Sequence, residues 1–193
     1  TLPPIEDMIT SFEWALNPDG DTSTDYDVPD VINNSWRWYN EIDTFQCSGY
    51  AVELMNVIEA AGIANIFSAG NNGPDNDGVR SPQRINTNLV NTFCVGSINA
   101  NDENYPISSF SCRGPTQCSG EGSLAIYPEV VAPGQNVRSA WGTNDFNTIS
   151  GTSMASPHVS GAVLLLKEAF PFLSGQEILL ALYNTANDLG DIG

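Results

Sequence analysis

The chain alternates short apolar runs with amphipathic helical stretches, and this alternation limits the fold more than any other feature. Apolar runs lie in DVINNSW (30–36), ANIFS (64–68) and TFCVGSI (92–98). Apolar residues recur at helical spacing in residues 4–16 and 51–61. Short strands of this kind, separated by helices, are typical of a parallel sheet that helices cover on both faces. The predicted fold class is therefore α/β, a three-layer and mostly parallel sheet.

The second half of the chain continues the pattern. The stretches PEVVAPGQNVRSAW (128–141) and FNTISG (146–151) predict a strand pair, and two helices follow it. The last helix is expected to begin at Ser174, because Glu177 three residues later completes a capping box. The sequence shows no repeats, and none of its polar loops separates two halves. We expect one domain over residues 1–193.

The charge of the chain limits its partners. Twenty-three acidic residues against six basic ones give a formal net charge of −17. This charge argues against nucleic acid or an anionic membrane as a partner. No apolar run approaches the ~20 residues that a membrane-spanning helix needs. A solvated acidic coat, as in secreted extracellular proteins, is the preferred interpretation.

Calcium binding is the alternative interpretation of the acidic residues, because carboxylates are calcium ligands. The candidate loops carry Asp19, Asp21, Asp25 and Asp27 in one case, and the pair at 75 and 77 in the other. Neither loop fits the full spacing of a calcium-binding loop. Structural calcium therefore remains possible, its ligands are unknown, and no cofactor is required.

The four cysteines indicate an oxidised protein rather than a zinc site. Cys47, Cys94, Cys112 and Cys118 contain no C-x-x-C pair, and one histidine cannot complete an ordinary zinc set. The short spacing between Cys112 and Cys118 suggests a local disulfide. Buried free thiols are the alternative.

Three polar stretches follow predicted strands, at the edge where α/β sheets bind ligands: NNSW (33–36), SAGNNG (68–73) and GTSMASPH (151–158). If Thr152 caps the following helix, Ser153 lies at its amino end, where unpaired N–H groups favour an anion. Acyl transfer needs a second donor for the oxyanion, and Asn71 is the candidate. The alternative is that these stretches are only a cap and a turn.

His158 is the only histidine of the sequence. On a helix that turns ~100° per residue, it points roughly 140° away from Ser153. We therefore expect a packed or capping histidine, not a general base. A serine without a base is a weak nucleophile.

Five stretches together resemble the subtilisin-like serine proteases, or subtilases. GTSMASPHVSGAVLLLK (151–167) is similar to the serine motif of that family. DVINNSW, FSAGNNG (67–73), ISSFSCRGP (107–115) and EVVAPGQNVRSAWG (129–142) resemble its other segments in the same order. Within the family, the chain is most similar to secreted enzymes of the bacillopeptidase F type. The resemblance implies a subtilisin-like fold and hydrolysis of polypeptides.

The resemblance also implies roles for single residues. Ser153 would be the nucleophile that forms an acyl-enzyme, and Asn71 would donate to the oxyanion together with the Ser153 N–H. Ser35 and Trp36 would lie on the strand that pairs with the substrate backbone. Ala69 and Gly70 would line the first specificity pocket.

The sequence also departs from the family pattern. Subtilases carry their catalytic residues in the order Asp, His, Ser, and neither the Asp-[ST]-Gly motif nor the His-Gly-Thr-His helix start is present. We expect the chain to be the carboxyl-terminal portion of a catalytic domain, incomplete on its amino-terminal side and inactive alone. Its partner would be the missing amino-terminal part of the same domain. The alternative is a secreted pseudopeptidase or peptide-binding module.

Two further expectations follow from this alignment. Arg37 replaces a common glycine after NNSW, and Arg80 lies near the expected pocket floor, where a guanidinium would favour an acidic substrate side chain. An exposed loop arginine is the alternative for Arg80. If sheet strands are missing, the DVINNSW strand should expose an apolar edge, and the isolated chain should self-associate.

Overall fold

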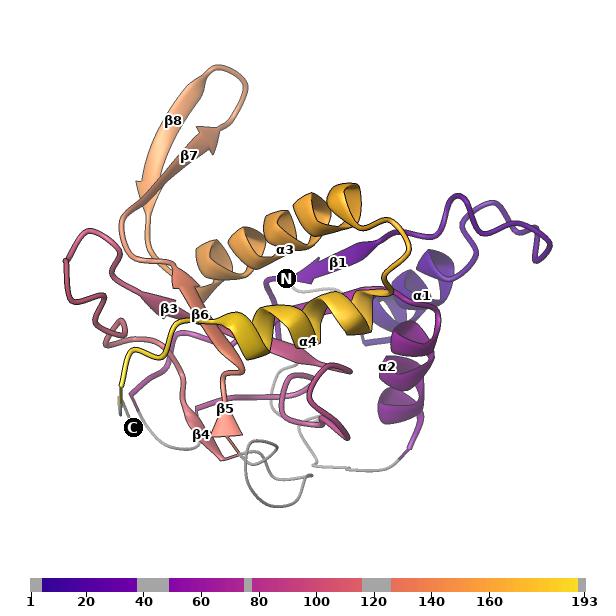
Figure 1. Ribbon diagram of the computed structural model, residues 1–193, viewed down its shortest axis with the longest axis horizontal. Coiled ribbons are helices and arrows are strands. Elements are labelled where there is room, and N and C mark those ends of the chain that lie inside the picture. Colours follow the sequence, from indigo (N-terminus) through magenta and orange to yellow (C-terminus); the bar gives the residue numbers. More distant parts are fainter. Residues whose placement is uncertain (1–4, 38–48, 75–77, 116–125, 191–193) are drawn as a thin grey trace.

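The computed structural model describes residues 5–37, 49–74, 78–115 and 126–190. Its centre is a four-stranded sheet in which every neighbouring pair of strands is parallel (Figure 1). The spatial order is β1-β2-β3-β6. These strands are β1 (Val31–Asn34), β2 (Ala64–Ser68), β3 (Phe93–Ile98) and β6 (Val130–Pro133). The predicted parallel α/β sheet is therefore confirmed.

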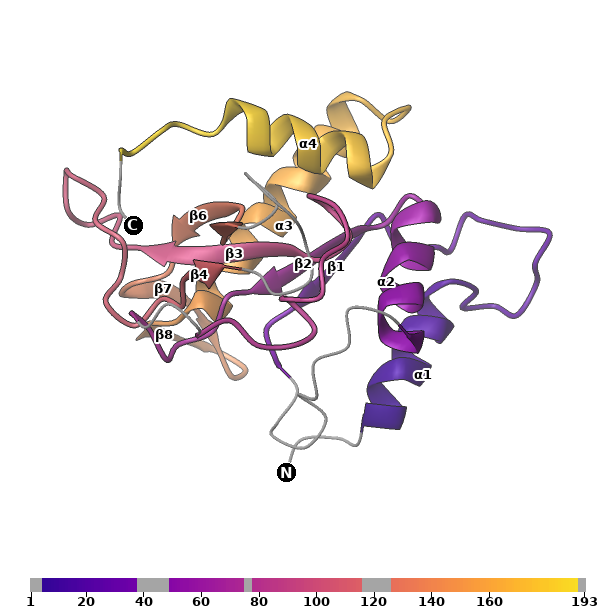
Figure 2. The same cartoon turned by 90° about the horizontal axis from the view of Figure 1, so that it is seen from below.

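Helices cover both faces of this sheet (Figure 2). Helices α3 (Thr152–Ala169) and α4 (Gly175–Thr185) pack on one face, and α1 (Ile5–Ala15) and α2 (Tyr50–Ala60) lie on the other. Neighbouring residues of a strand point to opposite faces. Ile66 accordingly packs under α3 and α4, whereas Phe67 packs under α1 and α2.

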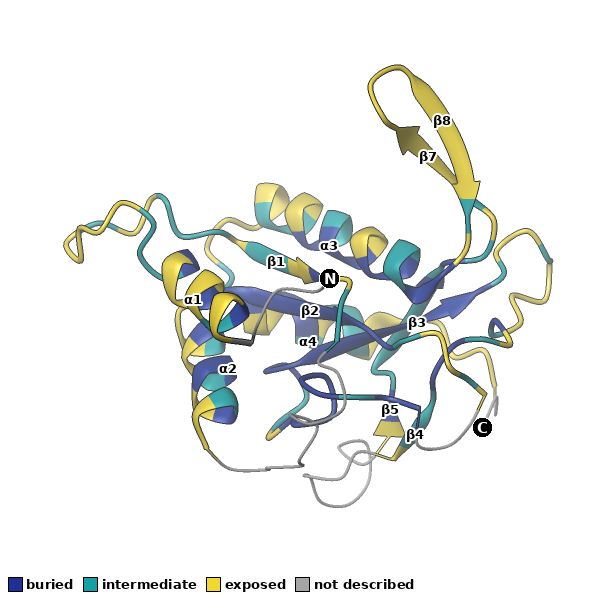
Figure 3. Cartoon of the chain, turned by 180° about the vertical axis from the view of Figure 1, so that it is seen from behind, coloured by how far each residue is buried: buried dark blue, intermediate teal, exposed yellow. Residues whose placement is uncertain are grey.

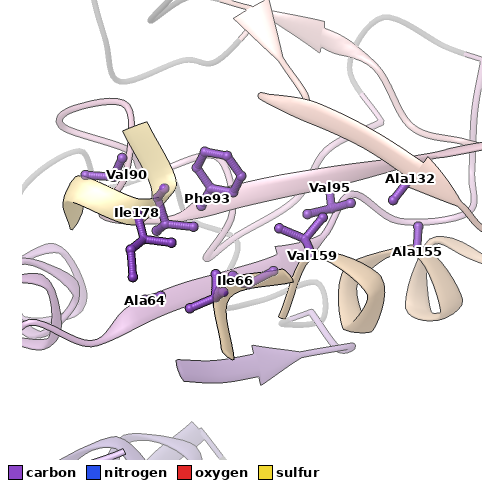
Figure 4. Packing of buried hydrophobic residues seen from close by; sticks show 11 residues of the cluster. Ala64, Ile66, Val90, Phe93, Val95, Ala132, Ala155, Val159 and Ile178 are labelled. Carbon is purple, nitrogen blue, oxygen red and sulfur yellow. The ribbon is translucent and has the colours of Figure 1, made fainter. Parts of the chain in front are cut away.

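The larger core lies between the sheet and the two carboxyl-terminal helices (Figure 4). Ile66 and Val95 from the strands meet Ala155 and Val159 from α3 and Ile178 from α4. These strands are apolar on both sides, because each side contacts a helix layer. The three-layer architecture follows from that pattern.

The helix ends agree with the sequence. Ser174 caps α4 and forms the predicted capping box with Glu177. Helix α2 ends just before Gly62, whose φ of +81° is a left-handed conformation that favours glycine. Helix α1 occupies the range expected for the first helix.

The predicted strand pair is a hairpin, but it uses less of the chain than expected. Strand β7 (Val137–Trp141) pairs antiparallel with β8 (Asp145–Ile149), and this hairpin projects from the rest of the molecule (Figure 1). Nearly all of it is exposed (Figure 3). The preceding apolar residues, β6, instead join the parallel sheet beside β3. Strands β4 (Gly114–Pro115) and β5 (Ile126–Tyr127) form a second, two-residue pair.

Strand β1 lies at one edge of the sheet and has a partner only on its β2 side. Val31 and Ile32 in it are half-buried, and Asn33 is exposed. The expected open edge is therefore present in the described part of the chain.

The expected disulfide is not found. Cys94 and Cys112 are both buried and both free. Both lie in a small cluster with Ala69, Val79 and Tyr127. Cys47 and Cys118 lie outside the described residues. The alternative prediction of buried free thiols is correct for this pair.

The described residues contain neither a cluster of metal-ligating side chains nor a membrane-spanning helix. No group of three or more His, Cys, Asp or Glu side chains is arranged to hold a metal ion. In the loop at 19–27, Asp19 and Asp21 accept hydrogen bonds from backbone N–H groups of the loop itself. The other candidate carboxylates, Asp75 and Asp77, lie outside the described residues. None of the described helices is both long and apolar enough to span a membrane.

Candidate active site

Ser153 is the second residue of α3, at the edge of the sheet where the parallel strands end. The predicted cap is wrong: the residue at the N-cap position is Gly151, and no side chain caps this helix. Thr152 is already helical, and its side chain is committed elsewhere. The amino end of α3 therefore keeps its unpaired N–H groups and its favourable potential for an anion.

Thr152 connects the start of α3 to the loop that follows β2. The Asn71 Oδ1 accepts hydrogen bonds from the Thr152 N–H and from the Thr152 Oγ1, both at 2.9 Å. The same Oγ1 accepts the N–H of Gly70 at 3.0 Å. Thr152 is fully buried. These three bonds fix the position of the Asn71 carboxamide relative to Ser153.

This arrangement leaves two donors beside Ser153. The Asn71 Oδ1 accepts both bonds from Thr152. The Asn71 Nδ2 donates to none of the described residues. The Ser153 N–H likewise has no partner in the described part of the chain. A Cβ atom on Gly151 would lie 3.3 Å from the Asn71 Nδ2, so glycine keeps this space open. Two unpaired donors at a helix amino end are suited to binding an oxyanion.

The end of β1 also reaches Ser153. The Ser35 Oγ donates to the Ser153 carbonyl oxygen at 3.3 Å and lies 3.2 Å from the Ser156 Oγ. The structure thus brings together Ser35, Asn71 and Ser153 from three distant stretches of the sequence.

Ala69 and Gly70 lie directly beneath this site. Ala69 is buried in a cluster with Val79, Cys94 and Cys112. Gly70 has a φ of +102°, and a Cβ atom there would lie 3.1 Å from the Cys112 Sγ. Glycine is therefore required at position 70 for both the backbone and the space.

The side chain of Trp36 does not face the site. Its ring packs against Phe12 at 6.1 Å and Phe67 at 5.9 Å between centroids, in the core under α1 and α2. The Trp36 carbonyl oxygen accepts a hydrogen bond from Gln83.

A groove of about 440 Å³ runs between the β7–β8 hairpin and the start of α3. Ser153, Met154 and His158 line one side, and Arg138 and Trp141 of β7 line the other. The Arg138 guanidinium lies 4.3 Å from the centre of the Phe146 ring. The nucleophile candidate therefore lines an open groove.

His158 is exposed, and its Nδ1 lies 2.8 Å from the Met154 carbonyl oxygen. A carbonyl only accepts, so Nδ1 carries the proton and Nε2 is free. The expectation of a packed or capping histidine is wrong, since the ring lies on the surface and bonds within its own helix. No hydrogen bond joins it to the Ser153 hydroxyl, which has no partner in the described ranges.

Buried titratable groups lie behind the site. Burial raises the pKa of Glu129 well above its ordinary value, although its carboxylate accepts the Cys94 N–H at 2.7 Å. Burial likewise raises the pKa of both the Cys94 and the Cys112 thiols. These thiols are therefore weak nucleophiles at neutral pH.

Sequence reasoning missed the two residues that hold the site together, Thr152 as the link to Asn71 and Gln83 as the link to Trp36. A threonine before the serine was visible, but its partner is 81 positions away. Nothing in the sequence marks Gln83, which lies in a long polar loop.

Comparison with known proteins identifies the family of the chain. The model of the subtilase family matches residues 5–193. The chain belongs to the subtilase family. It is 34% identical over 189 residues to bacillopeptidase F of Bacillus subtilis (strain 168), covering 96% of this chain and 12% of that protein. It is 33% identical over 168 residues to subtilisin DY of Bacillus licheniformis, covering 83% of this chain and 56% of that protein.

Solved structures show the same relationship. The S41 psychrophilic protease superposes with a TM-score of 0.68 at 26% identity, over 92% of this subtilase chain and 55% of that chain. Sphericase superposes with a TM-score of 0.70 at 24% identity, over 93% and 55%. The chain thus spans about half the length of these structures and of subtilisin DY. The predicted subtilisin-like fold is confirmed.

Proposed function

We propose that this chain is the serine-bearing portion of a subtilase catalytic domain that cleaves polypeptides through an acyl-enzyme on Ser153. The observation that supports this most directly is the orientation of Asn71. Its oxygen is held by Thr152, so its N–H groups are available to the oxyanion of a tetrahedral intermediate. A side chain needed only for a turn would not require two hydrogen bonds from the residue before the serine.

In this mechanism the Ser153 hydroxyl attacks the substrate carbonyl carbon, and the Asn71 Nδ2 and Ser153 N–H stabilise the oxygen that becomes negative. The amide leaving group departs after it gains a proton, and water then hydrolyses the ester on Ser153. The groove beside β7 would hold the polypeptide. Ser35 and Trp36 would contribute backbone to the substrate strand, and Ala69 and Gly70 would line its first pocket.

A base for the Ser153 hydroxyl is the missing component. The described residues place no histidine or carboxylate in hydrogen-bonding contact with it, and the Nδ1 of His158 is engaged with Met154. We propose that residues 1–193 form one domain together with an amino-terminal part that supplies the acid and the base. By itself the chain would be inactive, as a serine without a base is weakly nucleophilic.

The further details of the proposal concern specificity and environment. Arg80, half-buried in the loop after β2, would favour an acidic substrate side chain in the first pocket. The reaction itself needs no cofactor, and structural calcium stays part of the proposal with its ligands unassigned. A secreted, extracellular protein is consistent with the acidic charge.

The unpartnered Ser153 hydroxyl also favours a second candidate, a pseudopeptidase that keeps the peptide groove without turnover. Fluorophosphonate labelling, read by intact mass and peptide mapping, separates the two. The probe reports an activated serine, and Ser153→Ala is the control for its site. The peptidase proposal predicts no labelling of the isolated chain and labelling at Ser153 in the full-length natural precursor. A precursor that does not label would support the pseudopeptidase instead.

A further inference from the structure

Gln83 joins the ends of β1 and β2, which lead into the proposed substrate strand and the loop that carries Asn71. Its Nε2 donates to the Trp36 carbonyl oxygen at 3.0 Å and to the Ser68 carbonyl oxygen at 2.8 Å. Ser68 is the last residue of β2, and Trp36 lies just beyond β1. One side-chain amide therefore ties the end of β2 to the segment just beyond β1.

Each of these segments carries a site residue. Ser35, beside Trp36, contacts the Ser153 carbonyl oxygen. Ser68 leads directly into the loop that ends at Asn71, whose oxygen is held by Thr152. The Gln83 amide thus lies between the strand proposed to pair with substrate and the loop that carries the oxyanion donor.

Gln83 is itself held firmly. Its side chain is buried, with 1% of the residue exposed. Its backbone carbonyl accepts the Thr92 Oγ1 at 3.0 Å and also the Tyr127 hydroxyl. Because the backbone of Gln83 is held in place and its side chain is buried, its amide can fix the distance between the two carbonyl groups that it bonds.

The remaining atom of this amide is not satisfied. The Gln83 Oε1 is buried and has no hydrogen-bond partner in the described part of the chain. An unpaired buried acceptor destabilises a fold, so the side chain is not optimised for stability alone. An apolar side chain of equal size could fill the same space but could not donate the two hydrogen bonds to Trp36 and Ser68.

We propose that Gln83 is a positioning residue that sets the spacing between the substrate strand at Ser35–Trp36 and the oxyanion loop at Ala69–Asn71. The expected effect on catalysis rests on the proposed peptidase function. The hydrogen-bonded link between the two segments does not. A displacement of about 1 Å between reacting groups can reduce a rate by roughly 10²-fold. The spacing of these two segments decides whether the substrate carbonyl reaches Ser153 and Asn71 together.

The link is tested first without catalysis, by amide hydrogen exchange on Gln83→Met in the full-length natural precursor. Methionine matches glutamine in length and tolerates burial but cannot donate. We expect exchange to accelerate by roughly tenfold in both segments, 35–37 and 68–71, because each loses a bond to a buried carbonyl. The matched control is Asn91→Leu, which removes hydrogen bonds of an equally buried amide at the far end of β3. Unchanged exchange in the two segments, or an equal rise in the control, would overturn the proposal.

The consequence is tested by comparing two probes of Ser153 in the same precursor. A small fluorophosphonate needs only the serine and the oxyanion loop, which Thr152 still anchors. A peptidyl phosphonate also needs the substrate strand. For Gln83→Met we expect peptidyl labelling to fall roughly 10- to 100-fold and small-probe labelling to fall less than about threefold. Equal losses, or no loss with either probe, would contradict a positioning role. If the unmutated precursor labels with neither probe, the peptidase proposal fails, and hydrogen exchange alone decides the role of Gln83.

Discussion

At the scale of single residues, the site depends on how one carboxamide is oriented. Asn71→Asp keeps an oxygen for both bonds from Thr152 but removes the N–H donors. We expect labelling of Ser153 in the full-length precursor to slow by roughly 10²–10³-fold, the known effect of removing an oxyanion donor in a subtilisin. The melting temperature should change little, because the buried bonds remain. A variant that labels at the normal rate would show that Asn71 is not a donor.

Thr152 offers a complementary test, since it holds Asn71 without contacting substrate. Thr152→Val keeps the shape and removes both bonds of the Oγ1. We expect a loss of about 1–3 kcal/mol in the free energy of unfolding, because the Gly70 N–H is left without its partner. Urea denaturation measures this loss. Thr152→Ser keeps the hydroxyl and should behave nearly as the natural chain; equal destabilisation by both variants would refute the hydrogen-bond explanation.

Glu129 makes stability depend on pH. Its pKa is raised in the folded protein by burial, so the folded state keeps a proton that the unfolded chain has already lost. The favourable contribution is complete below the ordinary pKa of the carboxyl and is lost as pH rises through the folded pKa. Glu129→Gln should therefore gain stability relative to the natural chain on going from acidic to neutral pH. Urea denaturation across that range measures the difference, and parallel curves for the two chains would contradict it.

At the scale of elements, α4 is stabilised by a local signal that can be tested alone. The Ser174 Oγ accepts the Glu177 N–H at 3.2 Å, and the Glu177 carboxylate accepts the Ser174 N–H at 2.7 Å. Ser174→Ala should cost about 1 kcal/mol, since one helix donor loses its partner. Thermal denaturation followed by circular dichroism measures it, with Ser174→Asp as a control that retains an acceptor. A larger loss for Asp than for Ala would argue against capping.

The β7–β8 hairpin is the element whose bounds the sequence predicts least well. Its strands contain few apolar residues, and both of its faces are largely exposed. The pairing register from Val137 with Ile149 to Trp141 with Asp145 is set by the short connecting turn rather than by a core. The residues of β6 and β7 lie in one stretch of the sequence, so the sequence did not show that β6 and β7 are separate strands.

At the scale of the whole molecule, the open edge of β1 predicts association. Unpaired N–H and C=O groups of an edge strand pair readily with another chain. We expect the isolated chain to sediment as a dimer or larger species whose fraction rises with concentration. A stable monomer at all concentrations in analytical ultracentrifugation would contradict this prediction.

The sequence by itself determined the elements and the family. Periodicity predicted the helices of the first and last thirds of the chain, and apolar runs predicted β2 and β3. The stretch around Ser153 identified the nucleophile candidate. These signals are local, because each depends on residues a few positions apart. The same holds for the capping box at Ser174.

Tertiary structure alone decided how these pieces act together. The bonds from Thr152 to Asn71 and from Gln83 to Trp36 and Ser68 join residues that are far apart in the chain, and no local pattern encodes them. The turn of Trp36 into the core and the free thiol of Cys112 also depend on neighbours from other elements. A side chain's chemistry can be read from sequence, but its hydrogen-bond partners are fixed only when the sheet brings its strand ends together.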